Sequence, residues 1–166
     1  IPTDIYFGKG QINHLGKKIS EIAKKVLLVY GGGSIKKIGL YDEVIQQLKQ
    51  ADVEVYELAG VEPNPRIQTV RKGVDICKKE GIEAVLAVGG GSTIDCAKVI
   101  AAGTCYDGDA WDLVLDSDKI TKTLPIVSVL TLAATGSEMD GFAVISDMEK
   151  NEKWGTGNDI TKPVFS

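Results

Sequence analysis

Long apolar runs are absent from this sequence, which has no stretch approaching the ~20 apolar residues that a membrane-spanning helix needs. The first residues also lack the charged and apolar regions of a signal peptide. The three cysteines, Cys77, Cys96 and Cys105, have no metal or redox spacing. An odd number of unpatterned cysteines suits a reducing compartment, so we expect a cytoplasmic protein.

Histidine is also scarce, since His14 is the single one in 166 residues. Catalytic zinc and iron sites usually combine two or three imidazoles with a carboxylate, so this chain cannot build one alone. A net charge of −4 argues against general affinity for nucleic acid or for an anionic membrane. Cys77 and Cys96 fall on helical patterns and are better read as buried apolar residues than as nucleophiles.

The composition, with 43% hydrophobic and 25% charged residues and 19 glycines, is that of one globular α/β domain. Continuous apolar runs at 26–30, 84–88 and 124–130 predict strands buried on both faces. Residues 53–58 alternate apolar and acidic side chains, as a strand near a sheet edge does. A short strand at 5–7 precedes them, and a hairpin of residues 143–146 and 163–166, with its turn near Asn151, ends the chain.

Helical spacing of apolar residues separates these strands, in segments that begin near Leu15, Leu40, Ile67 and Ile94. Alternating strands and helices imply right-handed crossovers. We therefore predict a doubly wound, mostly parallel Rossmann-like sheet with helices on both faces. The stretch 107–122 is polar and rich in aspartate, and no helix is predicted there.

Two of the predicted strands run directly into a GGGS turn, at residues 31–34 and 89–92. Glycines let a ligand approach bare backbone, and the first N–H groups of the following helix attract an anion. We interpret the second turn as a phosphate site. An alternative is that Ser92 and Asp95 form only a capping box, without a ligand.

Hydroxyl-bearing residues also follow the strand at 124–130, in the stretch 131–137. Ligands of parallel sheets bind at the carboxyl ends of the strands. All of these turns are therefore expected at one edge of the sheet. A purely structural α/β domain would leave this coincidence unexplained.

Neither glycine turn has the G-x-G-x-x-G fingerprint of a standard Rossmann dehydrogenase, because Ile94 and Lys36 stand where the third glycine belongs. Four other motifs occur in order, namely YGGGSIKKIG, EPNP, AVGGGSTIDCAK and TLAATGSEMD. With them, nearly the whole chain resembles the N-terminal cofactor-binding domain of the iron-containing (group III) alcohol dehydrogenases. The resemblance is to their branch of NADPH-dependent aldehyde reductases and butanol dehydrogenases.

This resemblance implies that residues 1–166 form one NADP-binding domain, of the dehydroquinate synthase-like kind. The implied cofactor-binding residues are Gly90, Gly91, Ser92 and Asp95 at the pyrophosphate and ribose, Thr131, Thr135 and Ser137 towards the nicotinamide, and Lys153 beside a cofactor hydroxyl. Asp140 stands where this branch often has asparagine, which would put a negative charge near the nicotinamide.

Cofactor preference is expected to depend on the first turn. Enzymes that prefer NAD bind the ribose 2′-hydroxyl with a carboxylate. Here the strand ends in glycines, Gly32 and Gly33 among them, and Ser34, Lys36 and Lys37 follow. A hydroxyl, backbone N–H groups and two lysines suit a 2′-phosphate, so we predict NADP(H) over NAD(H). Alternatively, the lysines are a solvated helix start.

In the family that the chain resembles, a helical C-terminal domain supplies an aspartate and three histidines to a divalent metal, iron or zinc. That metal polarises the substrate while hydride passes between the nicotinamide and a primary alcohol or aldehyde such as butanol or butanal. We expect this domain to be missing, and hence no catalytic or metal-binding residue in the chain and little activity from it alone. An apolar face left exposed would favour a homo-oligomer.

Two alternatives remain open. Glycerol dehydrogenases and dehydroquinate synthases share the GGGSxxD turn, although YGGGSIKK and EPNP argue against them. A free-standing nucleotide- or phosphate-binding module without enzymatic activity is the second alternative.

Overall fold

The computed structural model describes residues 11–131, 142–147 and 152–157. Its main sheet contains β1 (Lys25–Tyr30), β2 (Glu54–Leu58), β3 (Ala84–Gly89) and β4 (Ile126–Leu130). The strand order is β2-β1-β3-β4, and every pair is parallel. The predicted parallel sheet is confirmed, with β2, the strand of alternating pattern, at its edge. The expected strand at 5–7 lies outside the described residues.

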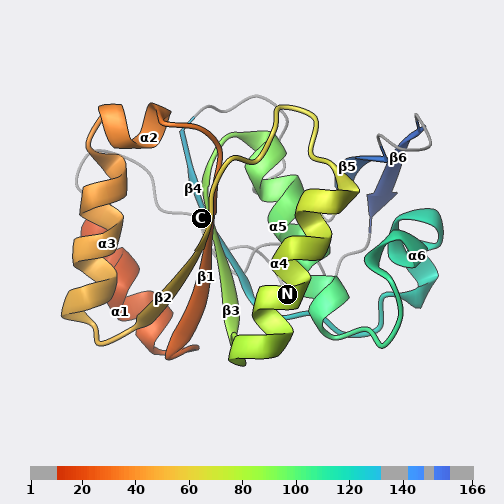
Figure 1. Cartoon of the computed structure of the whole chain (residues 1–166). Helices are drawn as coiled ribbons and strands as arrows, with labels where there is room; N and C mark the ends of the chain where they lie inside the picture. The colour runs from red at the N-terminus through yellow and green to blue at the C-terminus, as the bar shows by residue number, and fades with distance from the viewer. Residues whose placement is uncertain (1–10, 132–141, 148–151, 158–166) are drawn as a thin grey trace.

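Helices cover both faces of this sheet, as the doubly wound prediction required (Figure 1). On one face lie α1 (Leu15–Ser20), which follows the 3-10 turn η1 (Gln11–His14), α2 (Ser34–Lys37) and α3 (Leu40–Gln50). On the other face lie α4 (Ile67–Glu80), α5 (Gly91–Thr104) and α6 (Ala110–Leu115). The sheet is therefore the middle layer of three.

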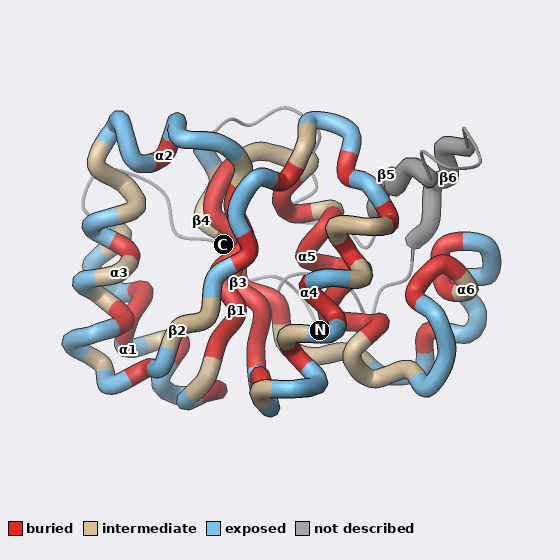
Figure 2. Tube along the Cα trace, in the orientation of Figure 1, coloured by how far each residue is buried: buried red, intermediate tan, exposed pale blue. Residues whose placement is uncertain are grey.

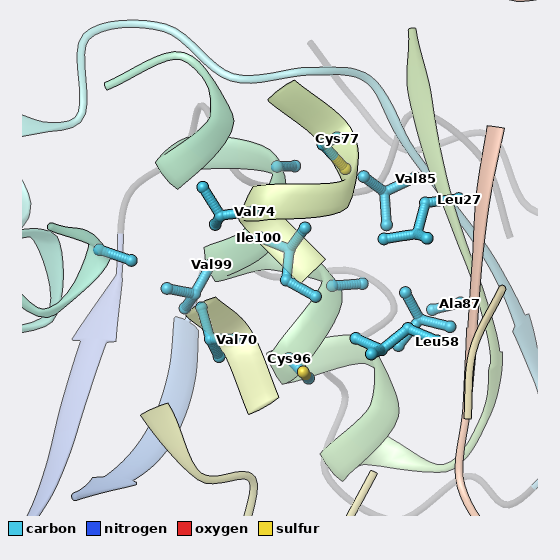
Figure 3. Packing of buried hydrophobic residues seen from close by; sticks show 14 of the residues in the cluster. Leu27, Leu58, Val70, Val74, Cys77, Val85, Ala87, Cys96, Val99 and Ile100 are labelled. Carbon is cyan, nitrogen blue, oxygen red and sulfur yellow. The ribbon is translucent and has the colours of Figure 1, made fainter. Parts of the chain in front are cut away.

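Each face of the sheet packs into its own apolar cluster, and Figure 2 shows the central strands β1 and β3 between them as mostly buried. Alternation along β1 explains the division, because Leu27 and Val29 join the cluster beneath α4 and α5 while Leu28 joins the one beneath α3. In the cluster beneath α4 and α5, Val74 of α4 and Ile100 of α5 lie beside the strands (Figure 3). Full burial of β1 and β3 accounts for their unbroken apolar sequence.

The second half of the chain departs from two expectations. The polar stretch 107–122 contains α6 and the 3-10 turn η2 (Ser117–Lys119), because Trp111 and Val114 bury one side of a short helix and Leu113 buries another. The hairpin pairs β5 (Phe142–Asp147) with β6 (Glu152–Gly157). Its first strand agrees with the prediction, and the predicted turn near Asn151 lies outside the described residues. Placing the second strand at 163–166 was wrong, because β5 pairs with the segment nearest to it in the chain rather than with the next apolar run.

Every helix in the described part of the chain is too short or too polar to cross a membrane.

Candidate dinucleotide site

The turn between β3 and α5 depends on its glycines. Gly89 has a φ of +150°, and a Cβ built on it would lie 2.9 Å from Thr93 Oγ1, so only glycine fits there without strain. Gly90 is the N-cap of α5 in extended conformation, and a Cβ on it would have no atom within 4 Å. Gly90 therefore leaves open space beside the first N–H groups of this 14-residue helix.

The capping-box alternative for this helix is wrong. Gly90 is the N-cap, so Ser92 does not stand at the capping position that this alternative requires. Ser92 already lies inside the helix, and its hydroxyl donates to the carbonyl of Pro63 in the loop after β2. Asp95, half-buried, lies one turn further along α5.

The first GGGS turn leaves the neighbouring strand β1. Gly32 and Gly33 also have nothing within 4 Å of a built Cβ, and Ser34, Lys36 and Lys37 are exposed on the one-turn helix α2. This turn therefore presents bare backbone, a hydroxyl and two cations at the same end of the sheet.

The loop after β2, which contains the EPNP motif, is hydrogen-bonded to the end of β1 on one side and to α4 and α5 on the other. The N–H groups of Gly60 and Val61 donate to the carbonyls of Gly31 and Tyr30, at 2.9 and 3.2 Å. Glu62 accepts hydrogen bonds from the Thr69 hydroxyl at 3.0 Å and from the Arg66 N–H at 3.4 Å, which satisfies one backbone donor at the start of α4. These bonds hold Pro63 where Ser92 can donate to it.

The end of β4 completes the edge. The Thr131 N–H donates to the Gly89 carbonyl at 2.9 Å, and Thr131 is exposed. The registers Tyr30↔Val88 and Gly89↔Leu130 bring the ends of β1, β3 and β4 to one level. The structure thus brings together the predicted residues of both GGGS turns and Thr131.

The remaining predicted residues are not placed in this way. Thr135, Ser137 and Asp140 lie outside the described residues. Lys153 is opposite Ser146 in the hairpin, and only its backbone is described.

Lys36 also belongs to a second group of side chains at this edge, whose other members were not predicted from the sequence. The hydroxyls of Tyr30 and Tyr41 donate to the two carboxylate oxygens of Glu57, at 2.7 and 2.8 Å. The Lys36 ammonium lies over both rings, 4.8 Å from the centroid of Tyr41 and 5.6 Å from that of Tyr30. We refer to Tyr30, Lys36, Tyr41 and Glu57 as the tyrosine cluster.

The tyrosine cluster keeps its phenols protonated. Burial, reinforced by the Glu57 carboxylate, raises the pKa of Tyr30 to about 12. The hydrogen bond to Glu57 is the largest cause that raises the pKa of Tyr41. The strand period could have indicated this cluster, since Glu57 lies two residues after Val55 on the face of β2 towards α3, and Tyr30 ends the same face of β1.

Cys77 and Cys96 are buried in the apolar cluster beneath α4 and α5. Burial raises the pKa of Cys77 to about 11 and also raises that of Cys96, which confirms the interpretation of both as buried side chains. Among the residues that the structure describes, no group of three or more His, Cys, Asp or Glu could hold a metal ion.

Known proteins match both the sequence and this architecture. The family model "Iron-containing alcohol dehydrogenase" matches residues 2–166. NADH-dependent butanol dehydrogenase A of Clostridium acetobutylicum is 60% identical over 166 residues, which are 100% of this chain and 43% of that protein. NADPH-dependent aldehyde reductase YqhD of Escherichia coli is 42% identical over 168 residues, covering 99% and 43% of the two chains.

The crystal structure of NADH-dependent butanol dehydrogenase A from Thermotoga maritima superposes with a TM-score of 0.96 at 48% identity, covering 99% of this chain and 42% of that one. The chain thus spans less than half the length of these relatives. Because the family model covers almost every residue and the relatives share the fold throughout the match, the chain belongs to the iron-containing alcohol dehydrogenase family.

Proposed function

We propose that the chain is the dinucleotide-binding domain of an alcohol dehydrogenase, whose whole protein interconverts a primary alcohol and its aldehyde, such as butanol and butanal. The names of the relatives support the substrate class, since they include butanol dehydrogenases and an aldehyde reductase. The observation that carries the proposal is the open backbone at the start of α5, next to the ends of β1 and β4.

This edge suits a pyrophosphate. The N–H groups at the start of a long helix carry partial positive charge, and glycine lets phosphate oxygens reach them. Gly90 and Gly91 would bind the pyrophosphate with Ser92, and Asp95 would face the adjoining ribose. Thr131 would then line the way to the nicotinamide, with Thr135, Ser137, Asp140 and Lys153 as further proposed contacts.

A bound nicotinamide would supply or accept hydride, and the task of this chain would be to bind and orient it. The described residues do not fit the metal that the family's name implies, because they bring no suitable ligands together. We propose that the metal ligands lie in a helical domain, as the family resemblance implies, and that this chain alone has little activity. Oligomerisation stays a prediction from the apolar face that such a domain would cover.

The preferred cofactor in this proposal is NADP(H). The names of the relatives divide, with NADH at 60% identity and NADPH at 42%. Support for NADP(H) comes from the side chains at the end of β1 and β2. Each oxygen of Glu57 already accepts a phenol hydrogen bond, so a ribose 2′-hydroxyl would compete with two tyrosines for this carboxylate. Lys36, whose ammonium lies over the Tyr41 ring, would be a cation for a 2′-phosphate.

Calorimetric titration with NADPH and, separately, NADH tests both the binding of a dinucleotide and the preference for NADP(H). We expect binding of both, with NADPH tighter at low salt. Gly90→Val should lower affinity for either cofactor more than about tenfold, because its side chain would fill the space where phosphate oxygens approach. The matched control is Gln50→Val, because Gln50 is exposed at the end of α3, at the edge of the sheet where the parallel strands begin. This variant should bind both cofactors normally.

Tighter binding of NADH would contradict only the 2′-phosphate assignment. Absence of binding to either cofactor, or full affinity in Gly90→Val, would contradict the proposed site.

A further inference from the structure

We propose that Tyr41 is a positioning residue that sets the preference of this site for a 2′-phosphate: its ring carries the Lys36 ammonium and its hydroxyl holds Glu57 away from that cation. This inference rests on the proposed binding of a nicotinamide dinucleotide. It adds a specificity role for a residue that need not touch the cofactor.

The first step is the placement of the cation. The rings of Tyr30 and Tyr41 are 5.6 Å apart and inclined at 59°, and the Lys36 ammonium lies over both. Aromatic faces attract a cation without taking up its hydrogen-bond donors. Lys36 held in this way keeps its N–H groups for a phosphate, and less side-chain entropy is lost when the phosphate binds.

The second step is the placement of the carboxylate. Glu57 is exposed on β2, and each of its oxygens accepts one phenol hydrogen bond. Removing the Tyr41 hydroxyl would leave one oxygen without its donor, next to the ring that carries Lys36. An ion pair between Glu57 and Lys36 would then compete with the phosphate for the same donors. The phenol therefore keeps two opposite charges from neutralising each other.

The third step is location. Tyr30 is the last residue of β1, so its backbone continues directly into the turn at 31–34. Lys36 lies in α2, and Tyr41 is the second residue of α3. The cluster thus stands beside Ser34 at the carboxyl end of the sheet, where the adenosine half of a dinucleotide would meet a cation from this turn.

Four variants separate the roles. Lys36→Met removes the charge, Tyr41→Leu removes the ring and the hydroxyl, and Tyr41→Phe removes the hydroxyl alone. Tyr56→Phe is the matched control, because the Tyr56 hydroxyl donates to Glu54 on the same strand, at 3.3 Å, while its ring packs on the opposite face of the sheet.

The readout is the ratio of the dissociation constants of NADH and NADPH, measured by calorimetry at low salt. Lys36→Met should lower this ratio about tenfold, as loss of a charge-assisted contact does. Tyr41→Leu should lower it about two- to fivefold, the range of an exposed cation–π contact. Tyr41→Phe should lower it less, and Tyr56→Phe should leave it unchanged.

The decisive comparison is the double variant Lys36→Met/Tyr41→Leu. If Tyr41 acts through Lys36, the double variant should have the same ratio as Lys36→Met alone. Additive losses would overturn the inference, since Tyr41 would then act by another route. An unchanged ratio in both Tyr41 variants would overturn it as well.

A measurement without ligand distinguishes failure of this inference from failure of the proposed function. Ring currents should shift the Lys36 ε-methylene protons upfield in the NMR spectrum, and Tyr41→Leu should reduce the shift. Unshifted Lys36 protons in a chain that prefers NADPH would overturn this inference and leave the proposed function intact. A chain that binds neither cofactor would overturn the proposed function, and the specificity role of Tyr41 with it.

Discussion

Gly89 and Gly32 stand at the same edge of the sheet but are glycine for different reasons. Gly89 has the φ of +150° that other residues avoid, and its Cβ would press on Thr93. Gly89→Ala should therefore lower the free energy of unfolding by about 1–3 kcal/mol. Gly32→Ala, in open space, should change it by less than about 0.5 kcal/mol. Urea unfolding of both variants checks this, and equal losses would contradict it.

The buried thiol of Cys77 makes stability depend on alkaline pH. Its pKa of about 11 lies above the value of about 8.5 expected in the unfolded chain. Below the unfolded pKa both states keep the proton, so the full stability is present. Above it the unfolded thiol ionises first, and stability falls until the pH passes the folded pKa.

We therefore expect the free energy of unfolding to fall between about pH 8 and 10 by more in the wild type than in Cys77→Ala. Urea unfolding at these two pH values provides the comparison. The variant will be less stable at both because a side chain is lost, so the difference between the pH values is the quantity to compare. Equal differences in the two proteins would contradict a raised pKa for this thiol.

The helices α4 and α5 pack closely against each other because Gly73 of α4 has no side chain. A Cβ at Gly73 would lie 2.8 Å from Ile100 Cγ1 and 3.1 Å from Leu58 Cδ2. Gly73→Ala should therefore destabilise by about 1–3 kcal/mol through overpacking. In an Ile100→Val background, where a methyl group is removed, the same change should cost less. A double-mutant cycle by urea unfolding measures this coupling, and a coupling of zero would contradict the packing.

Most elements could be predicted because their apolar periods were strong. The strands β1 and β3 are continuous apolar runs, and α4 shows buried residues at helical spacing. The exceptions were elements whose reason lies elsewhere in the chain. The helix α6 is short, and Arg71 of α4 forms a two-bond contact with Asp109 immediately before it, at 3.0 and 2.7 Å. A tertiary contact of this kind leaves no period in the sequence.

The candidate site shows the same division. Its glycine turns and Thr131 could be expected at one edge, because parallel strands end together. For the tyrosine cluster, the strand period places Tyr30 and Glu57 on one face of the sheet. Their contact also needs the register that sets Leu28 against Glu57, and Tyr41 needs the turn that brings it back over β1, and neither of these can be read from the period. The bond from Ser92 to Pro63 likewise joins residues 29 apart in sequence, through a hydroxyl that looked like a helix cap.

For the whole molecule, the two apolar clusters share the strands β1 and β3. We expect the amides of these strands to exchange with solvent only through global unfolding. The amides of the edge strand β2 and of α2, with its single turn, should exchange faster through local opening. Hydrogen exchange followed by NMR or mass spectrometry gives the order. Protection of β2 equal to that of β3 would contradict this arrangement.

The hydrogen bond from Ser92 to Pro63 affects how any other hydrogen-bond acceptor can bind Ser92 at the start of α5. A hydroxyl has one proton to give, and here the loop after β2 receives it. An acceptor that takes this proton must release Pro63 from Ser92. By thermodynamic reciprocity, any change that strengthens the hold of Ser92 on the loop weakens the acceptor by the same factor. Binding of an acceptor at the start of α5 is therefore coupled to release of the loop that contains Pro63, because both depend on the single proton of the Ser92 hydroxyl.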